Sequence, residues 1–469
     1  MAPKRKIAEL PLTSIWEEGA VNKTLADNKS SQKHSFKLWK WMIAHPDVML
    51  NDVPMEKWCF PKAVIKEFKT NFSQFTSRIV EKSTSIRGDT TKLLIELQDG
   101  HRIETVVIQH LGHTTVCVSS QVGCQMGCKF CATGTMGIIG DLTSGEIIEQ
   151  VVYANMVSKV RNVVFMGMGE PLNNFENVKL AVEFLADAKR FGLSPRHITI
   201  STVGVVRSMY RLTDELSHVN LALSLHAPTQ DIRLQIVPSA SAHPIEKLMT
   251  ALDYHITNNA APVKKSQLKV TSVMIEYILI KDVNDREEHA HLLGKLLLPR
   301  RNRVLLNLIP YNPTDVPGQN FQPPDQASID RFYQICTSDE YRIFSRVRQE
   351  MGQDIAGACG QLALKAGPSS ASGNATGDIE DIGARGSSDN GKTTRVSSKR
   401  CVPESSAVTR GRDIIDAPSH SVVTRVWTCL FGTYSGMTVT ALMAVSALFA
   451  VSQRARWMGL PAPFSAGRR

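Results

Sequence analysis

The sequence has no second pair of closely spaced cysteines, no apolar run after its basic first residues and no internal repeat. Structural zinc takes four ligands, usually as two pairs, so a lone cysteine-rich loop does not predict a zinc finger. Without an apolar run near the N-terminus we expect no targeting signal and a cytoplasmic location. Aromatic residues make up only 6% of the 469 residues, whereas hydrophobic residues make up 42% and charged residues 21%. This composition is typical of a soluble protein with more than one domain.

The charge and the cysteine content limit the classes of function. A net charge of +10 suggests nucleic acid as a partner, but residues 366–469 carry 12 Lys or Arg and 7 Asp or Glu. Half of the excess therefore lies in the tail, and charge alone is weak evidence for RNA. Nine cysteines at uneven spacing indicate a reducing compartment and metal chemistry, not a disulfide framework.

Residues 117–131, which read CVSSQVGCQMGCKFC, are the sharpest chemical signal in the chain. Cys124, Cys128 and Cys131 bring three thiolates onto one short loop, and thiolates select iron–sulfur clusters, zinc or copper over hard cations. A four-iron cluster normally takes four cysteines, so a loop with three leaves one iron open for another ligand. We therefore predict a cluster at this loop, with zinc as the alternative.

Apolar runs that alternate with amphipathic stretches predict the architecture after residue 110. Six strand–helix units indicate an α/β barrel with a parallel sheet. The stretch 341–349 is expected to form a last strand or helix. Upstream, residues 34–43 (HSFKLWKWMI) have helical spacing, and residues 92–108 alternate around an Asp-Gly turn, which predicts a hairpin. The expected parallel strands are residues 115–118, 163–166, 198–202, 221–225, 271–280 and 304–309.

The cysteine loop and its continuation, CVSSQVGCQMGCKFCATG, resemble the RlmN/Cfr family of radical S-adenosylmethionine (SAM) RNA adenine methyltransferases. Further motifs follow in the family's order and extend the resemblance over roughly residues 7–365. They are residues 167–171 (GMGEP), 200–206 (ISTVGVV), 221–228 (LALSLHAP), 307–313 (NLIPYNP) and 358–362 (ACGQL). The resemblance implies a partial (β/α)6 TIM-type barrel as the radical SAM core. Each motif lies at or just beyond the C-terminal end of an expected strand, where such barrels place their chemistry.

The resemblance also implies cofactors and site residues. A [4Fe-4S] cluster would be held by Cys124, Cys128 and Cys131. Positions that match the family's SAM contacts are Gly169, Glu170, Ser201, Ser224, Leu225, His226 and Asn312. The catalytic positions are Cys359, which carries the methyl group, Cys117, which resolves the covalent intermediate, and Glu104 as proton acceptor.

The implied reaction is methylation at C2 of adenine in large-subunit ribosomal RNA, with transfer RNA as a second substrate. The implied partners are these RNAs and an external electron donor, such as a flavodoxin or ferredoxin system. The enzyme itself is expected to be a monomer. Methylation at C8 of adenine uses the same two cysteines and stays open as an alternative. A non-catalytic iron–sulfur RNA-binding factor is a third reading, although such a protein has no need of Cys117 or Cys359.

The expected domains follow from the same patterns. Residues 1–95 are interpreted as an N-terminal helical accessory domain that binds RNA, with the hairpin continuing to residue 109, and residues 110–365 as the radical SAM core. Residues 366–425 are rich in Gly, Ser and Ala and are expected to be a disordered linker in the C-terminal extension. Residues 426–451 lack any charge, which is compatible with a transmembrane helix or an amphiphilic one. The stretch 137–142 (GIIGDL) departs from the family and places Asp141 near the expected RNA face.

Overall fold

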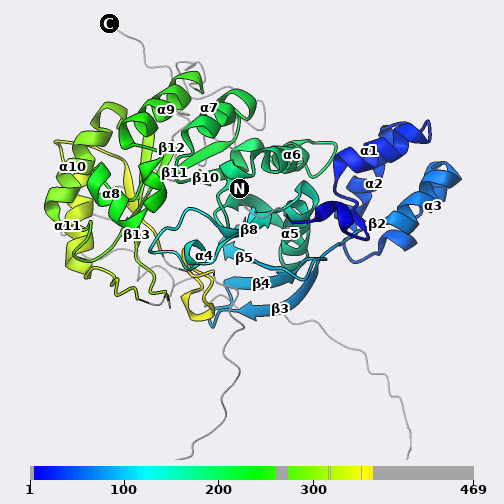
Figure 1. The fold of residues 1–469 in the computed structure, drawn as a ribbon, viewed down its shortest axis with the longest axis horizontal. Coiled ribbons are helices and arrows are strands. Elements are labelled where there is room, and N and C mark those ends of the chain that lie inside the picture. The colour runs from blue at the N-terminus through cyan, green and yellow to red at the C-terminus, as the bar shows by residue number, and fades with distance from the viewer. Residues whose placement is uncertain (1–4, 260–272, 315, 317, 350, 363–469) are drawn as a thin grey trace, which may run out of the picture. The chain divides into compact units, whose positions relative to one another are not determined.

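A computed structural model of the chain describes residues 5–259, 273–314, 316, 318–349 and 351–362 (Figure 1). Contacts divide the chain into two units, Met1–Ala375 and Thr376–Arg469, and all the described residues belong to the first. The expected linker 366–425 and the segment 426–451 lie outside the described residues. Among the helices that are described, none has the length and apolar character needed to cross a membrane.

The N-terminal part is helical and packs on the barrel through aromatic side chains. The helix expected at residues 34–43 is confirmed as α2, and its Trp39 is fully buried. The Trp39 indole Nε1 donates to the Ile15 carbonyl at 2.8 Å, and its ring meets Phe184 edge-on at 5.0 Å between centroids. The helices of this part are α1 (Glu18–Asp27), α2 (Lys33–Ala44) and α3 (Lys62–Asn71), with short 3-10 turns at Ile7–Glu9, Leu50–Asp52 and Met55–Trp58. A two-residue parallel pair joins the segment before α1 to the residues after α3; its strands are β1 (Thr13–Ser14) and β2 (Phe72–Ser73).

A ten-stranded sheet in the order β14-β13-β12-β11-β10-β9-β6-β5-β4-β3 forms the centre of the unit. Strand β6 and the strands from β9 to β14 pair in parallel, which confirms the partial α/β barrel. The stretch 341–349 contains a strand, β14, and the expected strand 271–280 is described from Val273. The parallel strands are β6 (His113–Cys117), β9 (Val160–Phe165), β10 (Ile198–Thr202), β11 (Asn220–Ser224), β12 (Val273–Leu279), β13 (Val304–Pro310) and β14 (Ser345–Val347).

Helices separate the parallel strands, as the right-handed strand–helix–strand connection requires. In Figure 1 the helices α6, α7, α9 and α10 follow one another around the outside of the sheet. The helices of the barrel are α5 (Ser144–Val157), α6 (Phe175–Ala186), α7 (Val206–Glu215), α8 (Gln230–Ile236), α9 (Ile245–Asn258), α10 (Glu287–Leu297) and α11 (Gln326–Thr337). Short 3-10 turns at Pro171–Asn173, Pro195–His197, Pro238–Ser241, Leu298–Arg300 and Gln353–Ile355 complete the connections.

The hairpin expected at residues 92–108 is confirmed as β4 (Thr90–Glu96) and β5 (Arg102–His110), with Gly100 at a φ of 80° in its turn. A further antiparallel strand, β3 (Arg78–Thr84), pairs with β4 at the edge of the sheet. The sequence pattern did not predict β3 because most of its side chains are polar and at least partly exposed. Antiparallel strands thus extend the parallel sheet on the side of β6.

Glu149 on α5 ties the N-terminal segment to the barrel. Its fully buried carboxylate accepts hydrogen bonds from the Ser14 hydroxyl and from the backbone N–H and hydroxyl groups of Thr76 and Ser77. Five donors from two separate stretches of chain therefore meet at one side chain. Loss of a shared buried acceptor leaves several donors unsatisfied at once.

We predict that Glu149→Ala lowers the free energy of unfolding by about 3 kcal/mol, because the donors around it lose their partner. Urea titration followed by tryptophan fluorescence measures the change. Asp339, whose side chain is 95% exposed, supplies the control, and Asp339→Ala should change the stability by less than about 0.5 kcal/mol. Equal losses in the two variants would contradict the role given to Glu149.

Candidate active site

A short hairpin of the chain shapes the loop that carries the three cysteines. Strand β7 (Gln121–Cys124) pairs with β8 (Gly137–Asp141), so the loop leaves β7 at Cys124 and returns through the one-turn helix α4 (Ala132–Thr135). Two glycines permit this geometry. A Cβ on Gly123 would lie 2.0 Å from the Gly137 carbonyl oxygen, and one on Gly134 would lie 2.8 Å from the carbonyl oxygen of Cys128. The sequence pattern did not predict this hairpin, since its strands are short and rich in glycine.

The three cysteines line one cavity of about 150 Å³. Cys124 and Cys128 are 9% and 7% exposed, and Cys131 is partly buried. Burial raises the pKa of the Cys124 thiol to about 12, and burial with repulsion from the neighbouring thiols raises the pKa of Cys128 as well. Three such thiolates need a bound cation to be stable in this cavity.

The donor set matches an iron–sulfur cluster. All three ligands on the loop are cysteines, whose thiolates are the usual ligands of such clusters, and all three line one cavity. A four-iron cluster is itself several atoms across, so its cysteines approach a shared cavity without approaching each other as closely as zinc ligands do. The residues present therefore fit the iron–sulfur group that the motif predicts.

The cavity that holds the thiols is also lined by most of the predicted SAM-binding residues, which are Gly169, Glu170, Ser201, Ser224 and His226. Gly169 adopts a φ of 102°, and a Cβ there would lie 2.6 Å from the Cβ of Gln121, so only glycine fits. The buried Glu170 carboxylate accepts from the backbone N–H groups of Leu172 and Val203, at 3.0 and 2.9 Å. Burial raises the pKa of Glu170 to about 7. A cationic ammonium group of a ligand would oppose that burial effect and favour the ionised carboxylate.

Three of these residues lie at the C-terminal ends of β10 and β11 or just beyond. The hydroxyl groups of Ser201 and Ser224 lie 3.2 Å apart. His226 adopts a left-handed φ of 60°, and its Nδ1 accepts from the backbone N–H of Ile278 at 3.1 Å. Burial lowers the pKa of His226 to about 3, so the imidazole is neutral and its Nε2 carries the proton.

Leu225 and Asn312 are placed differently from the other predicted SAM-binding residues. The Leu225 side chain is fully buried and packs in the core, while its backbone N–H donates to the Glu276 carbonyl at 3.1 Å. Asn312 lines a second, larger cavity, and its Nδ2 donates to the Cys359 carbonyl oxygen at 3.1 Å. In the structure Asn312 thus positions the loop that carries Cys359.

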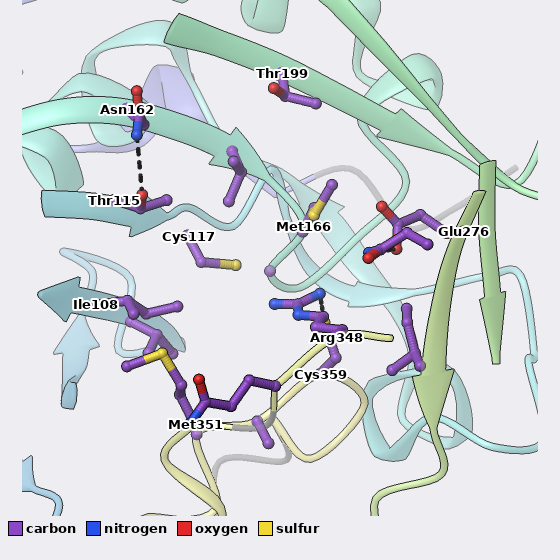
Figure 2. Close-up of a pocket in the computed structure, with 18 of the residues that line it drawn as sticks. Ile108, Thr115, Cys117, Asn162, Met166, Thr199, Glu276, Arg348, Met351 and Cys359 are labelled. Atoms are coloured by element: carbon purple, nitrogen blue, oxygen red, sulfur yellow. Dashed lines mark hydrogen bonds between the residues drawn. The ribbon is translucent and has the colours of Figure 1, made fainter. Parts of the chain in front are cut away.

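Cys117 and Cys359, far apart in the sequence, line this larger cavity of about 620 Å³. Figure 2 shows Cys117 at the end of its strand and Cys359 on the loop across the cavity. Burial, reinforced by Cys359, raises the pKa of the Cys117 thiol to about 12. Cys131 of the cluster loop borders both cavities.

The loop that carries Cys359 is attached directly to the cluster loop. The backbone N–H of Ala132 donates to the Gly360 carbonyl at 2.7 Å, and the Thr133 hydroxyl donates to the Leu362 carbonyl at 2.6 Å. Gly360 adopts a φ of 85°, and a Cβ there would approach the Phe130 carbonyl oxygen to 3.1 Å. The two cavities therefore share a wall made of both loops.

Arg348, which the sequence reasoning missed, contacts Cys359. Its guanidinium Nη1 donates to the Cys359 Sγ at 3.1 Å, and Coulombic interaction with Cys359 and Glu276 raises the pKa of Arg348. No motif surrounds Arg348 in the sequence. Glu276 was also missed, although a lone carboxylate within the apolar run of β12 could have drawn attention to it.

Glu104, the predicted proton acceptor, is buried on β5 and forms an ion pair with Lys92, with 3.0 Å between Oε1 and Nζ. It is not among the residues that line the two cavities. The same Lys92 lies 3.5 Å from the carbonyl oxygen of Ala356, on the segment that leads to Cys359. Asp141, a departure from the family pattern, accepts from the Gln121 side chain at 2.7 Å, and Gln121 in turn accepts from the Glu170 backbone N–H.

We predict that anaerobic reconstitution gives about four iron and four sulfide per chain, and that Cys128→Ala abolishes this content because one ligand is lost. Iron and sulfide analysis with absorption spectroscopy measures the outcome. Cys59→Ala is the matched control, since Cys59 is an exposed cysteine remote from both cavities. Stoichiometric zinc without charge-transfer absorption would contradict the cluster.

Comparisons with known proteins agree with this site. The model of the Radical SAM superfamily matches residues 118–293. The dual-specificity RNA methyltransferase RlmN 1 of Myxococcus xanthus is 43% identical over 286 residues, which cover 60% of this chain and 75% of the relative. A probable dual-specificity RNA methyltransferase, RlmN 2 of Protochlamydia amoebophila, is 38% identical over 347 residues, 70% of this chain and 92% of the relative.

A solved structure is similar as well. The crystal structure of a radical SAM methyltransferase from Sphaerobacter thermophilus matches with a TM-score of 0.67 and 34% identity, over 75% of this chain and all of the solved chain. Since the curated relatives exceed 30% identity and are matched over most of their length, this chain belongs to the RlmN family of radical SAM RNA methyltransferases.

Proposed function

We propose that this enzyme methylates C2 of adenine in large-subunit ribosomal RNA and in transfer RNA, through a methyl group carried on Cys359. The observation that supports this most directly is that Cys117 and Cys359 line one cavity, which the cluster loop borders. A methyl donor that acts by simple displacement needs neither cysteine. The names of the relatives, dual-specificity RNA methyltransferases, support RNA as the substrate.

The residues of the smaller cavity are proposed to hold the cofactors. Cys124, Cys128 and Cys131 bind the [4Fe-4S] cluster, which together with SAM supplies a methyl group and a hydrogen-abstracting radical. The Glu170 carboxylate pairs with the ammonium group of SAM. The other proposed contacts to SAM are Gly169, Ser201, Ser224, Leu225, His226 and Asn312.

Cys359 is proposed to receive the methyl group on its sulfur, where the Arg348 guanidinium stabilises negative charge at 3.1 Å. Hydrogen removal from the S-methyl group leaves a methylene radical that adds to C2. The adduct then loses the C2 proton and one electron, which the oxidised cluster would accept. Glu104 is proposed to accept that proton. Because its carboxylate is paired with Lys92, this role requires the ion pair to open.

Cys117 is proposed to release the product. Its thiolate forms an S–S bond with Cys359, the bond from the Cys359 sulfur to the methylene carbon breaks, and the electron pair stays with the base, which takes up a proton. The disulfide then needs two electrons from an external donor, for which we propose a flavodoxin or ferredoxin system.

We propose that the enzyme acts in the cytoplasm. All described cysteines are free thiols, which fits a reducing compartment. We also propose that it acts as a monomer. From the family resemblance, we further propose that the N-terminal residues 1–95 contact the RNA.

We predict that Cys117→Ala traps the enzyme on its RNA, because the methylene bridge forms but is not resolved. Cys359→Ala should form no adduct, since the sulfur that carries the methyl group is absent. Denaturing gels after anaerobic reaction show the covalent complex as a slower band that ribonuclease removes. Cys59→Ala controls for the loss of a cysteine as such and should turn over normally. Normal turnover by Cys117→Ala would refute the proposed roles.

The raised pKa of Cys117 predicts how product release depends on pH. With a pKa of about 12, nearly all of this group is a thiol at neutral pH, and the thiolate fraction rises about tenfold for each pH unit. The wild-type adduct should therefore be resolved about 100 times faster at pH 8.5 than at pH 6.5. Single-turnover reactions quenched in acid and analysed on denaturing gels measure this rate. A rate that does not change with pH would show that another group has already removed the proton from the Cys117 thiol before product release.

A further inference from the structure

A row of polar side chains crosses the parallel sheet at one level. Ser224, Glu276, Asn307 and Arg346 are cross-strand neighbours on β11, β12, β13 and β14. Side chains that are direct partners in a sheet point to the same face, and these four line one or both of the cavities inside the barrel. The Ser201 hydroxyl on β10 extends the row through its contact with Ser224.

One carboxylate oxygen in this row has no hydrogen-bond partner among the residues that the structure describes. Glu276 is 3% exposed, and its Oε2 accepts from the Asn307 Nδ2 at 2.7 Å. Among the described residues, no group donates to its Oε1. The Asn307 amide is held in this orientation because its Oδ1 accepts from the Arg346 Nε at 2.9 Å. A buried acceptor left unpaired is costly, so Oε1 is a prepared site for a ligand N–H or O–H donor.

The position of Glu276 indicates which ligand supplies that donor. Glu276 and Cys359 line both cavities, whereas Asn307, the partner of Glu276, lines only the larger one, as do Arg346 and Cys117. Figure 2 shows Cys117 and Glu276 facing the cavity from opposite sides, with Arg348 between them. In this cavity the base must meet the carbon carried by Cys359.

We propose that Glu276 Oε1 accepts a hydrogen bond from the exocyclic amino group of the substrate adenine, so that Glu276 recognises the base. This inference rests on the proposed function. Adenine presents an amino donor at its C6 position, whereas guanine and hypoxanthine present an oxygen acceptor there, which the carboxylate repels. The same contact selects adenine and holds the ring within the cavity that contains Cys359.

The test compares Glu276→Gln with the wild-type enzyme on two RNAs. One is a synthetic hairpin with a single unpaired adenine that the wild type methylates, and the other carries purine, which lacks the amino group, at that position. In the variant, the Asn307 Nδ2 should orient the glutamine carbonyl toward itself, which leaves an N–H donor at the former Oε1. Glu215→Gln on α7, a partly exposed carboxylate outside both cavities, is the control.

We expect purine to slow single-turnover methylation roughly 10- to 100-fold in the wild type and in Glu215→Gln. In Glu276→Gln, which is slower on adenine, purine should cause no further loss. Mass spectrometry of Cys359 after incubation with SAM under reducing conditions, without RNA, should show the same methyl content in all three proteins.

Several results would overturn the inference. If the wild type methylates the RNA with purine as fast as the RNA with adenine, the inference is wrong, and this result holds even if the variant fails to fold. An equal purine penalty in the wild type and the variant would show that another group reads the amino group. A loss of Cys359 methylation in Glu276→Gln without RNA would assign this residue to SAM. Failure of the wild type on both RNAs would overturn the proposed function itself, and this inference with it.

Discussion

The parallel register of the barrel strands is the constraint on which the site depends. Side chains alternate between the two faces of a strand, so a slip by one residue would turn every lumen-facing group of that strand outward. Apolar neighbours of Glu276, such as Ile275 and Tyr277, are fully buried and hold β12 in its register. The same packing therefore determines which polar groups face the cavities.

The polar groups of the lumen are held in place by backbone donors and by one another. The Glu170 carboxylate spans the loops after β9 and β10, and the His226 imidazole is held by the backbone of β12. Such groups keep their orientation before a ligand arrives, which is how a site lowers the cost of binding. Glu276 departs from this pattern at Oε1, to which no group among the described residues donates.

The loop of Cys359 and the cluster loop form one unit, because two hydrogen bonds from Ala132 and Thr133 join them. This attachment brings the Cys359 sulfur close to the boundary of the two cavities. Arg348 approaches from the segment after β14 and donates to the same sulfur. The position of this sulfur thus depends on contacts of its own loop with the cluster loop and with the segment after β14.

The sequence by itself determined the cysteine loop, the barrel class and the order of the strand-end motifs, because cysteine spacing and hydrophobic periodicity are local properties. It also indicated that Cys117 and Cys359 act together, through the family resemblance. The polar, partly exposed strand β3 and the glycine-rich hairpin of β7 and β8 gave no usable pattern.

Only the tertiary structure decided that Glu104 is paired with Lys92, that Asn312 holds the Cys359 loop, and that Arg348 contacts the Cys359 sulfur. It likewise revealed the row that contains Glu276. These contacts join residues 11 to 47 positions apart, or they depend on which face of an apolar strand a single side chain occupies. Both depend on how the strands pair in space, which no local pattern of residues encodes.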